Sequence, residues 1–286
     1  MAAHYIPQPH IPSIAFILIP AMPAVPEGKV LVSGCNGYIA VWVVKLLLED
    51  GFSVRGTVRR ESVIPYLKEF FKSYGDKFEV VIVPDITKVR VRAAITCADD
   101  TNSYAAPQEG AFDEAVKGVD AIEHTASPFS LNADDPQEII GPAVAGTVGM
   151  LDSAFRVAND TVRRIIVTSS CSSVLTVDPT NMKLNFFSER DWNEQSVREV
   201  EEKGRSADNI DKYHASKSLA ERAAWKWAEE HRGVAKFDVV ALNPPYVYGP
   251  VLHDVKSADA LNTSMLDFYN TIVKQNKSPE YIATLR

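Results

Sequence analysis

The sequence predicts a doubly wound α/β fold, in which helices cover both faces of a parallel sheet. From Lys29 onward, short runs rich in β-branched residues recur along the chain, and stretches with helical periodicity separate them. Strands that are apolar at nearly every position are buried on both faces, which is typical of parallel sheets. Right-handed crossover connections then give the strand order 3-2-1-4-5-6.

The expected elements alternate along the chain. The expected strands are 29–33, 53–59, 78–84, 119–124, 163–169 and 237–243. The expected helices are 37–50, 61–74, 109–117, 136–158, 211–231 and 258–275. The charged stretch 188–210 is interpreted as a surface excursion before the next helix.

The bulk composition narrows the class of protein. With 286 residues, 46% of them apolar and 23% charged, the chain resembles an ordinary globular protein with a sizeable core. A net charge of −7 provides no basic field for phosphate backbones, so no nucleic-acid partner is expected. The three cysteines form no C-x-x-C pair and the histidines show no ligand spacing, so neither a disulfide framework nor a metal is expected. The sequence carries no signal for an oligomeric state.

The N-terminal residues are strongly apolar but do not fit a membrane span. Pro12, Pro20 and Pro23 interrupt the apolar stretch 11–25, whereas a span needs about 20 unbroken apolar residues. A signal peptide would carry a basic n-region, yet the first basic residue is Lys29. We therefore interpret residues 1–26 as a leader outside the fold and expect a cytoplasmic protein with no membrane partner. Met22 fits a start better than Met1, because PAVPEGKVLVSG leads directly into the first strand.

A glycine-rich turn follows the first expected strand. Gly34, Gly37 and Ala40 have the spacing G-x-x-G-x-x-A. In such a turn the first glycine allows the tight bend, the second lets the backbone approach a pyrophosphate, and the small third residue lets the helix pack on the sheet. The helix N-terminus adds free N–H groups and partial positive charge. A purely structural glycine turn is the alternative, but this position in a βαβ unit favours a dinucleotide site and a Rossmann fold.

The end of the second expected strand distinguishes NAD from NADP. An NAD enzyme places Asp or Glu there to hold the ribose 2′-hydroxyl. Here Arg59 and Arg60 occupy the position, and the first acid is Glu61. A guanidinium can pair with a 2′-phosphate through charge-assisted hydrogen bonds. Although both arginines could instead be solvated surface groups, the sequence favours NADP.

Three residues form a candidate catalytic set. Tyr213 and Lys217 are four residues apart at the start of a long expected helix, so they share one face. An ammonium beside a phenol lowers the phenol pKa, and such a pair is a reasonable general acid for a carbonyl oxygen. Ser170 ends the fifth expected strand, on the sheet edge where ligands bind in doubly wound folds. A serine that merely caps the strand end is the alternative.

Several linked motifs carry a family resemblance. They are VLVSGCNGYIA (30–40), GTVR (56–59), HTASPF (124–129), VTSS (167–170), YHASK (213–217) and NPPYVYGP (243–250). With these motifs in this order, the chain resembles the extended short-chain dehydrogenase/reductase family, in the NAD-dependent epimerase/dehydratase superfamily. It is most similar to the dihydroflavonol-reductase-like branch and to fungal aldehyde and ketone reductases of the methylglyoxal-reductase type.

The resemblance implies contacts with each part of NADP(H). The implied residues are Gly34, Gly37, Tyr38 and Ile39 in the glycine loop, Arg59 at the 2′-phosphate, Asp85 and Ile86 at the adenine, Thr125, Ala126 and Ser127 at the nicotinamide ribose, Tyr213 and Lys217 at the same ribose, and Pro244 and Val247 at the nicotinamide ring. It also implies that Ser127, Phe129 and Tyr246 touch the substrate, although ordinary strand-end turns would explain the same motifs.

The chain departs from the family pattern in two places. Family members continue well past this length, so we expect residues 27–250 to form the NADP-binding domain and 251–286 to be an incomplete C-terminal substrate lobe. Residues 89–108 match nothing in the pattern, and joining Lys88 to Glu109 restores the usual length, so we hypothesise a retained in-frame intron. We also expect helix 258–275 to leave apolar side chains exposed, namely those of Leu261, Met265, Leu266, Phe268 and Tyr269. For the chain of 286 residues we therefore expect weakened NADPH binding, little reductase activity and poor solubility.

The sequence therefore favours an NADP(H)-dependent oxidoreductase that reduces an aldehyde or ketone to an alcohol, with Tyr213 as the proton donor. The expected partner is a small carbonyl compound, which the sequence does not identify further. One alternative is a nucleotide-sugar epimerase or dehydratase on the same fold, against which the arginine pair argues. The other is a non-catalytic NADP-binding protein or an inactive product of a truncated gene.

Overall fold

The computed structural model describes residues 25–87, 110–127, 133–176 and 185–274. Residues 1–24 of the predicted leader, the unmatched block 89–108 and Phe129 lie outside the described residues.

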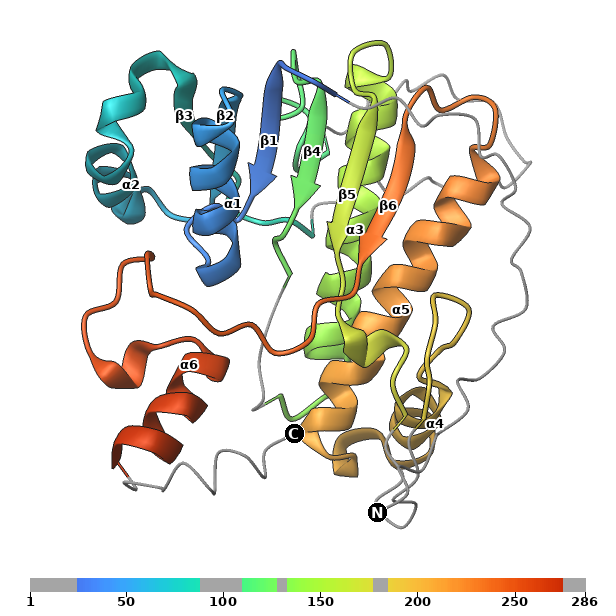
Figure 1. Cartoon of the computed structure of the whole chain (residues 1–286). Coiled ribbons are helices and arrows are strands. Elements are labelled where there is room, and N and C mark those ends of the chain that lie inside the picture. The colour runs from blue at the N-terminus through green and yellow to red at the C-terminus, as the bar shows by residue number, and fades with distance from the viewer. Residues whose placement is uncertain (1–24, 88–109, 128–132, 177–184, 275–286) are drawn as a thin grey trace, which may run out of the picture.

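A six-stranded parallel sheet forms the centre of the molecule (Figure 1). Its strands are β1 (Lys29–Ser33), β2 (Ser53–Val58), β3 (Phe78–Ile82), β4 (Ala121–His124), β5 (Arg164–Thr168) and β6 (Asp238–Leu242). They lie in the order β3-β2-β1-β4-β5-β6, which confirms the predicted topology. The register pairs Val32 of β1 with Gly56 of β2 and with Glu123 of β4. The carboxyl ends of all six strands therefore lie along one edge of the sheet.

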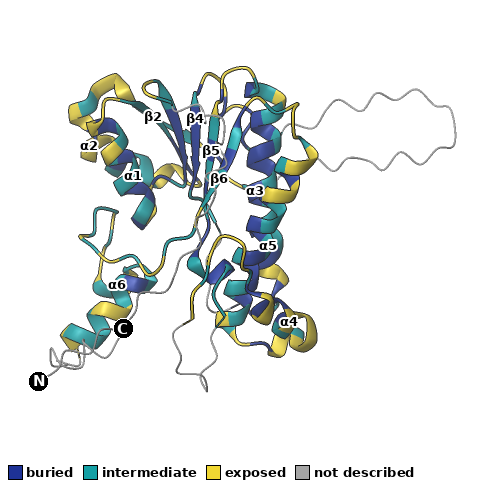
Figure 2. Ribbon diagram, turned by 45° about the vertical axis from the view of Figure 1, so that its right-hand side comes forward, coloured by how far each residue is buried: buried dark blue, intermediate teal, exposed yellow. Residues whose placement is uncertain are grey.

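Helices cover the two faces of the sheet as separate layers (Figure 2). The helices are α1 (Tyr38–Glu49), α2 (Ile64–Phe70), α3 (Gln137–Ala158), α4 (Glu194–Lys203), α5 (Asn209–Glu230) and α6 (Thr263–Phe268), with π-helical turns at Tyr269–Lys274. Short 3-10 segments lie at Glu61–Val63, Lys72–Lys77, Cys171–Ser173, Gly204–Ser206 and Ala258–Ala260. Helices α1 and α2 lie on one face of the sheet, and α3 and α5 lie on the other.

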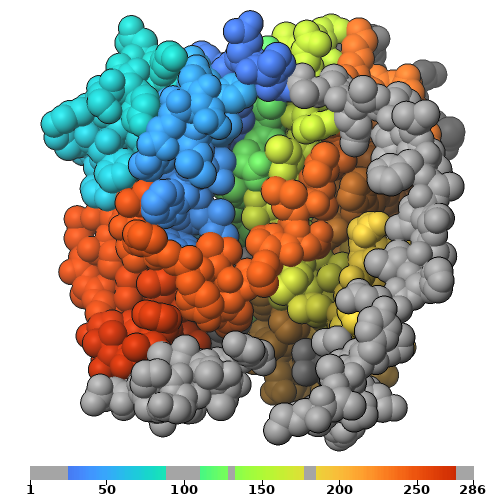
Figure 3. Space-filling view, in the orientation of Figure 1, coloured from blue at the N-terminus to red at the C-terminus, as the bar shows by residue number. Residues whose placement is uncertain are grey.

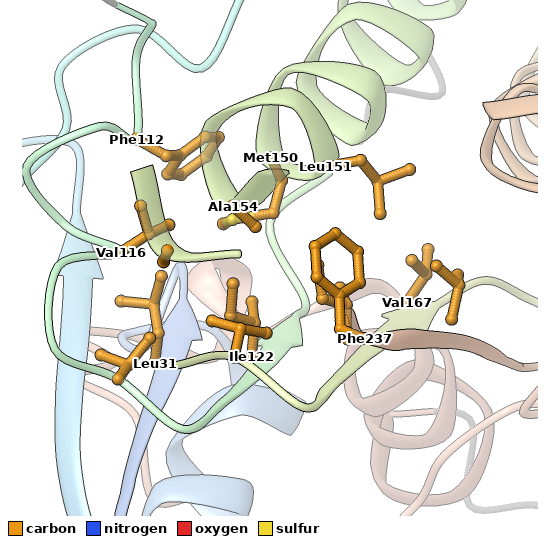
Figure 4. Close-up of a cluster of buried hydrophobic side chains, with 14 of the residues drawn as sticks. Leu31, Phe112, Val116, Ile122, Met150, Leu151, Ala154, Val167 and Phe237 are labelled. Carbon is orange, nitrogen blue, oxygen red and sulfur yellow. The ribbon is translucent and has the colours of Figure 1, made fainter. Parts of the chain in front are cut away.

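Two apolar cores correspond to the two layers. Beneath α1, the side chains of Val32, Val41 and Val44 are fully buried between the helix and the sheet. On the opposite face, α3 and α5 enclose a second core built around Leu31, Ile122 and Leu151 (Figure 4). Because adjacent residues of β1 enter different cores, both faces of the strand are apolar, which is the origin of its unbroken apolar pattern.

Two predicted elements were wrong. The stretch 188–210, expected to be a surface excursion, contains helix α4. Although most residues of α4 are charged or polar, Val197 and Val200 form a narrow apolar stripe that is buried against α3 and α5. The predicted helix 109–117 is instead a series of turns in the described part. Gly118, whose φ of +67° lies in the left-handed region, ends this segment.

The segment after β6 returns across the molecule to α1 and α2 (Figure 3). The Tyr38 hydroxyl donates to the Gly249 carbonyl at 3.0 Å, and the Trp42 indole N–H donates to the Pro250 carbonyl at 2.9 Å. Further along, the Tyr66 hydroxyl donates to the Leu252 carbonyl at 2.9 Å. These bonds hold the chain that leads into α6 against the first half of the sheet.

The apolar side chains of the last described helix are less exposed than predicted. Phe268 is 43% exposed and packs against Tyr248, with ring centroids 6.0 Å apart. The other four side chains of the predicted apolar set are half-buried; they are Leu261, Met265, Leu266 and Tyr269. Contacts within the segment after β6 therefore already shelter most of this surface.

Gly56 is a position where the fold tolerates no side chain. A Cβ there would lie 2.4 Å from Cys35 Sγ, and the Cys35 side chain is itself fully buried. Gly56→Ala is expected to destabilise the protein by about 1–3 kcal/mol through overpacking, measured by urea unfolding. Gly249→Ala is the matched control, because its added Cβ would make only an ordinary contact, 3.8 Å from the Tyr38 hydroxyl oxygen. That control should change the free energy of unfolding far less; equal losses in both variants would contradict the packing argument.

Candidate active site

The glycine loop between β1 and α1 has the geometry of an anion site. Gly34 adopts φ of +64°, and its N–H donates to the Thr57 hydroxyl at 3.1 Å. Gly37 caps α1 without a side-chain hydrogen bond, and a Cβ there would lie 3.2 Å from the Gly34 carbonyl oxygen. No acidic residue lies in the first turn of α1. The loop therefore leaves the positive N-terminal end of α1 open beside the carboxyl end of β1.

The loop after β4 packs directly against the glycine loop. The Thr125 hydroxyl donates to the Ser33 carbonyl, and the Ala126 N–H donates to the Ser33 hydroxyl at 2.9 Å. A Cβ on Gly34 would lie 3.2 Å from the Ala126 methyl carbon. The glycine at this position thus allows the turn and also the close approach of the neighbouring loop.

Two exposed arginines follow β2 beside the same loop. Thr57, whose carbonyl also accepts from the Cys35 N–H at 2.9 Å, fixes the end of β2 against the glycine turn. Arg59 lies two residues further on and Arg60 follows it, both exposed to solvent. Among the described residues, no acidic side chain forms an ion pair with either arginine. Both guanidinium groups are therefore available to an anion near the loop.

Ser170, Tyr213 and Lys217 come together at the carboxyl end of β5. The Ser170 side chain lies close enough to Tyr213 to lower the pKa of the phenol. Its hydroxyl also caps the 3-10 turn, because it donates to the Ser172 hydroxyl at 3.0 Å and accepts from the Ser172 N–H at 3.1 Å. Lys217, one turn further along α5, donates from Nζ to the Thr168 carbonyl of β5 at 3.4 Å. The helix thus presents its phenol and its ammonium to the same strand end.

The pKa values of this set differ from the sequence expectation. Burial raises the pKa of the Tyr213 phenol, and the nearby Ser170 side chain only partly opposes that effect. The predicted lowering of this pKa by Lys217 is not what the structure gives. Burial also lowers the pKa of Lys217 to about 8, against the opposing charge of Glu221. At neutral pH the phenol is therefore protonated, while the ammonium keeps most of its charge.

A narrow crevice lies between Lys217 and the loop after β4. Lys217, Thr168, Ala126 and Ser127 line it, whereas Ser170 and Tyr213 do not. The remaining lining residues are His124, Thr147, Val167, Ser169, Ala220 and Glu221. Lys217 and two residues of the predicted β4 loop, Ala126 and Ser127, thus border the same crevice.

The remaining residues predicted to contact the cofactor differ in their exposure and in their hydrogen-bond partners. Asp85 is exposed and accepts from the Thr87 hydroxyl at 2.6 Å, whereas Ile86 packs against Gly146 of α3. The Pro244 carbonyl accepts from the Cys171 N–H at 3.0 Å, next to Ser170. The Val247 carbonyl accepts from the Ser264 hydroxyl at 2.7 Å.

Tyr246 lies near the Tyr213 phenol. It is 61% exposed, and its phenol interacts electrostatically with that of Tyr213. Its ring stacks on Tyr248 with centroids 5.9 Å apart. An aromatic surface therefore adjoins the candidate proton donor.

Sequence reasoning missed several polar residues beneath the site. The Glu221 carboxylate is buried and accepts four side-chain hydrogen bonds, three of them at Oε2 and one, from the Trp225 indole, at Oε1. Glu123 and His124 of β4 are also buried, and burial raises the pKa of Glu123 to about 7 and lowers that of His124 to about 4. The helical spacing of Tyr213, Lys217 and Glu221 was the available signal for the first of these.

The comparisons with known proteins agree with this geometry. A sequence profile of the NAD dependent epimerase/dehydratase family matches residues 30–278. The chain belongs to this family. The resemblance predicted from the motifs is confirmed at that level.

Individual relatives in this family are fungal reductases. The chain is 34% identical to the NADPH-dependent methylglyoxal reductase of Saccharomyces cerevisiae, over 88% of this chain and 68% of the relative. It is 32% identical to aldehyde reductase 2 of Sporidiobolus salmonicolor, over 86% of this chain and 65% of the relative. The crystal structure of the yeast methylglyoxal/isovaleraldehyde reductase complexed with NADPH superposes with a TM-score of 0.70 at 32% identity, covering 88% of this chain and 67% of that one. The chain thus spans about two thirds of the length of these relatives.

Two negative findings concern the described residues alone. No helix in the described ranges is both long enough and apolar enough to cross a membrane. No group of three or more His, Cys, Asp or Glu side chains among the described residues is placed to hold a metal ion.

Proposed function

We propose that this protein is an NADP(H)-dependent reductase that converts an aldehyde or ketone to the alcohol. The observation that carries the proposal is the placement of Ser170 beside Tyr213, with Lys217 one helical turn away, at the strand edge that also bears the glycine loop. The relatives named as NADPH-dependent methylglyoxal reductase and aldehyde reductase support the same chemistry.

The residues present fit NADP(H). The diphosphate fits the loop of Gly34 and Gly37, where a Cβ would fill the space against neighbouring backbone and where the N-terminus of α1 is open. The 2′-phosphate fits the exposed guanidinium of Arg59. On the other side of the loop, Thr125, Ala126 and Ser127 would face the nicotinamide ribose together with Lys217. When bound, NADPH supplies the hydride that the carbonyl carbon receives.

The residues of the chain would handle the proton and the developing charge. The Tyr213 phenol, whose raised pKa keeps it protonated at neutral pH, donates its proton to the carbonyl oxygen. The Ser170 hydroxyl holds the phenol and hydrogen-bonds the same oxygen. The Lys217 ammonium stabilises the phenolate that proton transfer leaves behind. We propose Tyr246 and Ser127 as substrate contacts on either side of this position.

The segment after β6 would complete the substrate side. We propose residues 27–250 as the cofactor-binding domain and the segment from 251 as part of a substrate-binding lobe, since bonds from Tyr38 and Trp42 hold the start of that segment beside the glycine-loop helix. We propose the cytoplasm as the compartment, which the absence of any paired cysteine motif in the sequence supports.

A direct assay tests the proposal. The purified chain is mixed with NADPH and a panel of small aldehydes and ketones, and NADPH absorbance is followed. We expect oxidation that depends on the carbonyl compound. Tight NADPH binding without turnover of any carbonyl would count against the reductase, and turnover of a nucleotide sugar would instead favour an epimerase or dehydratase.

Cofactor choice gives a sharper test at Arg59. Arg59→Asp is expected to weaken NADPH binding by about 1–3 kcal/mol, because it removes a charge-assisted hydrogen bond to the 2′-phosphate. NADH binding should change far less. Dissociation constants for both cofactors are measured by fluorescence titration.

The control for this test changes the charge by the same amount elsewhere. Lys72, after α2, is 69% exposed and pairs with Glu69. Lys72→Asp should leave the preference between the two cofactors unaltered. Equal losses of NADPH and NADH affinity in Arg59→Asp would show that Arg59 does not contact the 2′-phosphate.

A further inference from the structure

We propose that Glu221 is the positioning residue of this site. Its carboxylate holds residues 169–173, the serine turn after β5, against α5 and keeps the Lys217 ammonium charged. The inference rests on the proposed reductase function for its kinetic consequence, but the arrangement itself is built from side chains outside the predicted catalytic set.

The Glu221 carboxylate connects three separate elements. One oxygen, Oε2, accepts from the Ser169 hydroxyl at 2.5 Å, from the Ser173 hydroxyl at 2.6 Å and from the Asn243 amide at 2.8 Å. These donors come from the end of β5, from the 3-10 turn Cys171–Ser173 and from the end of β6, respectively. The side chain of Glu221 is only 5% exposed. A single buried oxygen therefore joins α5 to two neighbouring strand ends.

The same network reaches the backbone of Ser170. Asn243 also donates from its amide to the Ser170 carbonyl at 3.0 Å, and the Ser173 hydroxyl, whose single proton is shared with Glu221, lies 2.8 Å from the same carbonyl oxygen. Ser170 is thus flanked on both sides by donors to Glu221 and is fixed through its own carbonyl. A displacement of the Glu221 carboxylate would move the serine turn relative to Tyr213.

The charge of Glu221 also faces Lys217. The two residues are four apart on α5, line the same crevice, and the carboxylate raises the pKa of the ammonium against the lowering by burial. The other titratable groups around Lys217 are Tyr213 on α5 and His124 on β4. His124 is neutral at pH 7 because burial lowers its pKa to about 4, and Tyr213 is protonated there. Of the residues that line the crevice, only Glu221 offers Lys217 a negative charge.

Glu221→Gln distinguishes a positioning role from a merely structural one, because the glutamine side chain has the shape of glutamate but carries no negative charge. We expect kcat to fall at least tenfold. Activity and NADPH affinity should both fall near pH 8, where Lys217 loses its proton; we call this fall the alkaline limb. In Glu221→Gln we expect the alkaline limb to move to lower pH by about one unit, because the carboxylate no longer raises the pKa of Lys217. Glu221→Asp retains the charge and should keep that limb near its wild-type position.

Asp113→Asn is the matched control. Asp113 is also buried, at 7% exposed, and its carboxylate is bonded to Arg156 and to the Gly110 N–H, away from the crevice. This variant should lower the melting temperature without moving the pH profile. If Glu221→Gln behaves in the same way, with a lower melting temperature and an unmoved limb, the proposal is overturned.

A second variant keeps the proposal testable if Glu221→Gln does not fold. Asn243→Ala retains the charge but removes the tether to the Ser170 carbonyl, so kcat should fall while the alkaline limb stays in place. A wild-type kcat in Asn243→Ala would contradict the positioning role. The pH profile of NADPH binding uses no carbonyl substrate. It therefore tests Glu221 even if the wild-type protein reduces none of the compounds in the panel and the proposed function fails.

Discussion

Tyr213→Phe is expected to lower kcat for carbonyl reduction by about 10²–10⁴-fold, the usual contribution of general acid catalysis. The substitution removes one hydroxyl from a side chain whose ring stays in place on α5. Since the pKa of this phenol is raised by burial, the wild-type group carries its proton at neutral pH and is ready to donate it. Steady-state kinetics with NADPH and an aldehyde measure the effect, and fluorescence titration should give a nearly unchanged NADPH dissociation constant.

Tyr74→Phe is the matched control for that loss. Tyr74 follows α2, remote from the crevice, and its ring packs against Phe71 with centroids 6.3 Å apart. Removing its hydroxyl should leave kcat unchanged. If Tyr213→Phe turned over at the wild-type rate, Tyr213 would be excluded as the proton donor, and the reduced oxygen would have to take its proton from another group.

The strand order and the glycine loop were predictable because local rules determine them. Strand β1 is apolar on both faces, with Leu31 in one core and Val30 and Val32 in the other, and Gly34 is the one residue of its turn at positive φ in the described loop. The α5 face was predictable for the same reason, because Tyr213 and Lys217 lie one turn apart. These signals lie within a few residues of one another in the sequence.

The contacts that depend on distant segments were not predictable in the same way. Glu221 binds donors from β5 and β6, and only the sheet order makes those strands neighbours. The raised pKa of Tyr213 also escaped prediction, because burial of the phenol is a tertiary property. Helix α4 was missed because its charges outnumber its buried residues, although Asn193 caps it by accepting from the Ser196 N–H at 2.9 Å.

The two buried residues of β4 are expected to have opposite effects on the pH dependence of stability. Burial, and secondarily the charge of Lys217, lowers the pKa of His124 from 6.5 to about 4, so the unfolded chain binds its proton more readily between these values. The contribution of His124 to stability therefore rises with pH across that window. Burial raises the pKa of Glu123 from 4.5 to about 7, so the folded chain holds that proton more tightly. Its contribution falls as the pH rises from 4.5 to 7. Each contribution amounts to about 3 kcal/mol.

Because the two windows overlap, these contributions nearly cancel in the wild-type protein, and single variants should reveal them. Glu123→Gln keeps an acceptor for the Thr168 hydroxyl, which lies 2.7 Å from the native carboxyl, and leaves only the histidine effect. Relative to wild type, its free energy of unfolding should rise by about 3 kcal/mol between pH 4.5 and 7, because the glutamate contribution that falls over this range is gone. His124→Asn leaves only the glutamate effect and, relative to wild type, should lose a similar amount between about pH 4 and 6.5, where the histidine contribution is missing. Urea unfolding across this range measures both, and the difference from wild type removes the contribution of every other carboxylate. Curves that run parallel to wild type in both variants would show that neither residue titrates in the folded protein as its burial requires.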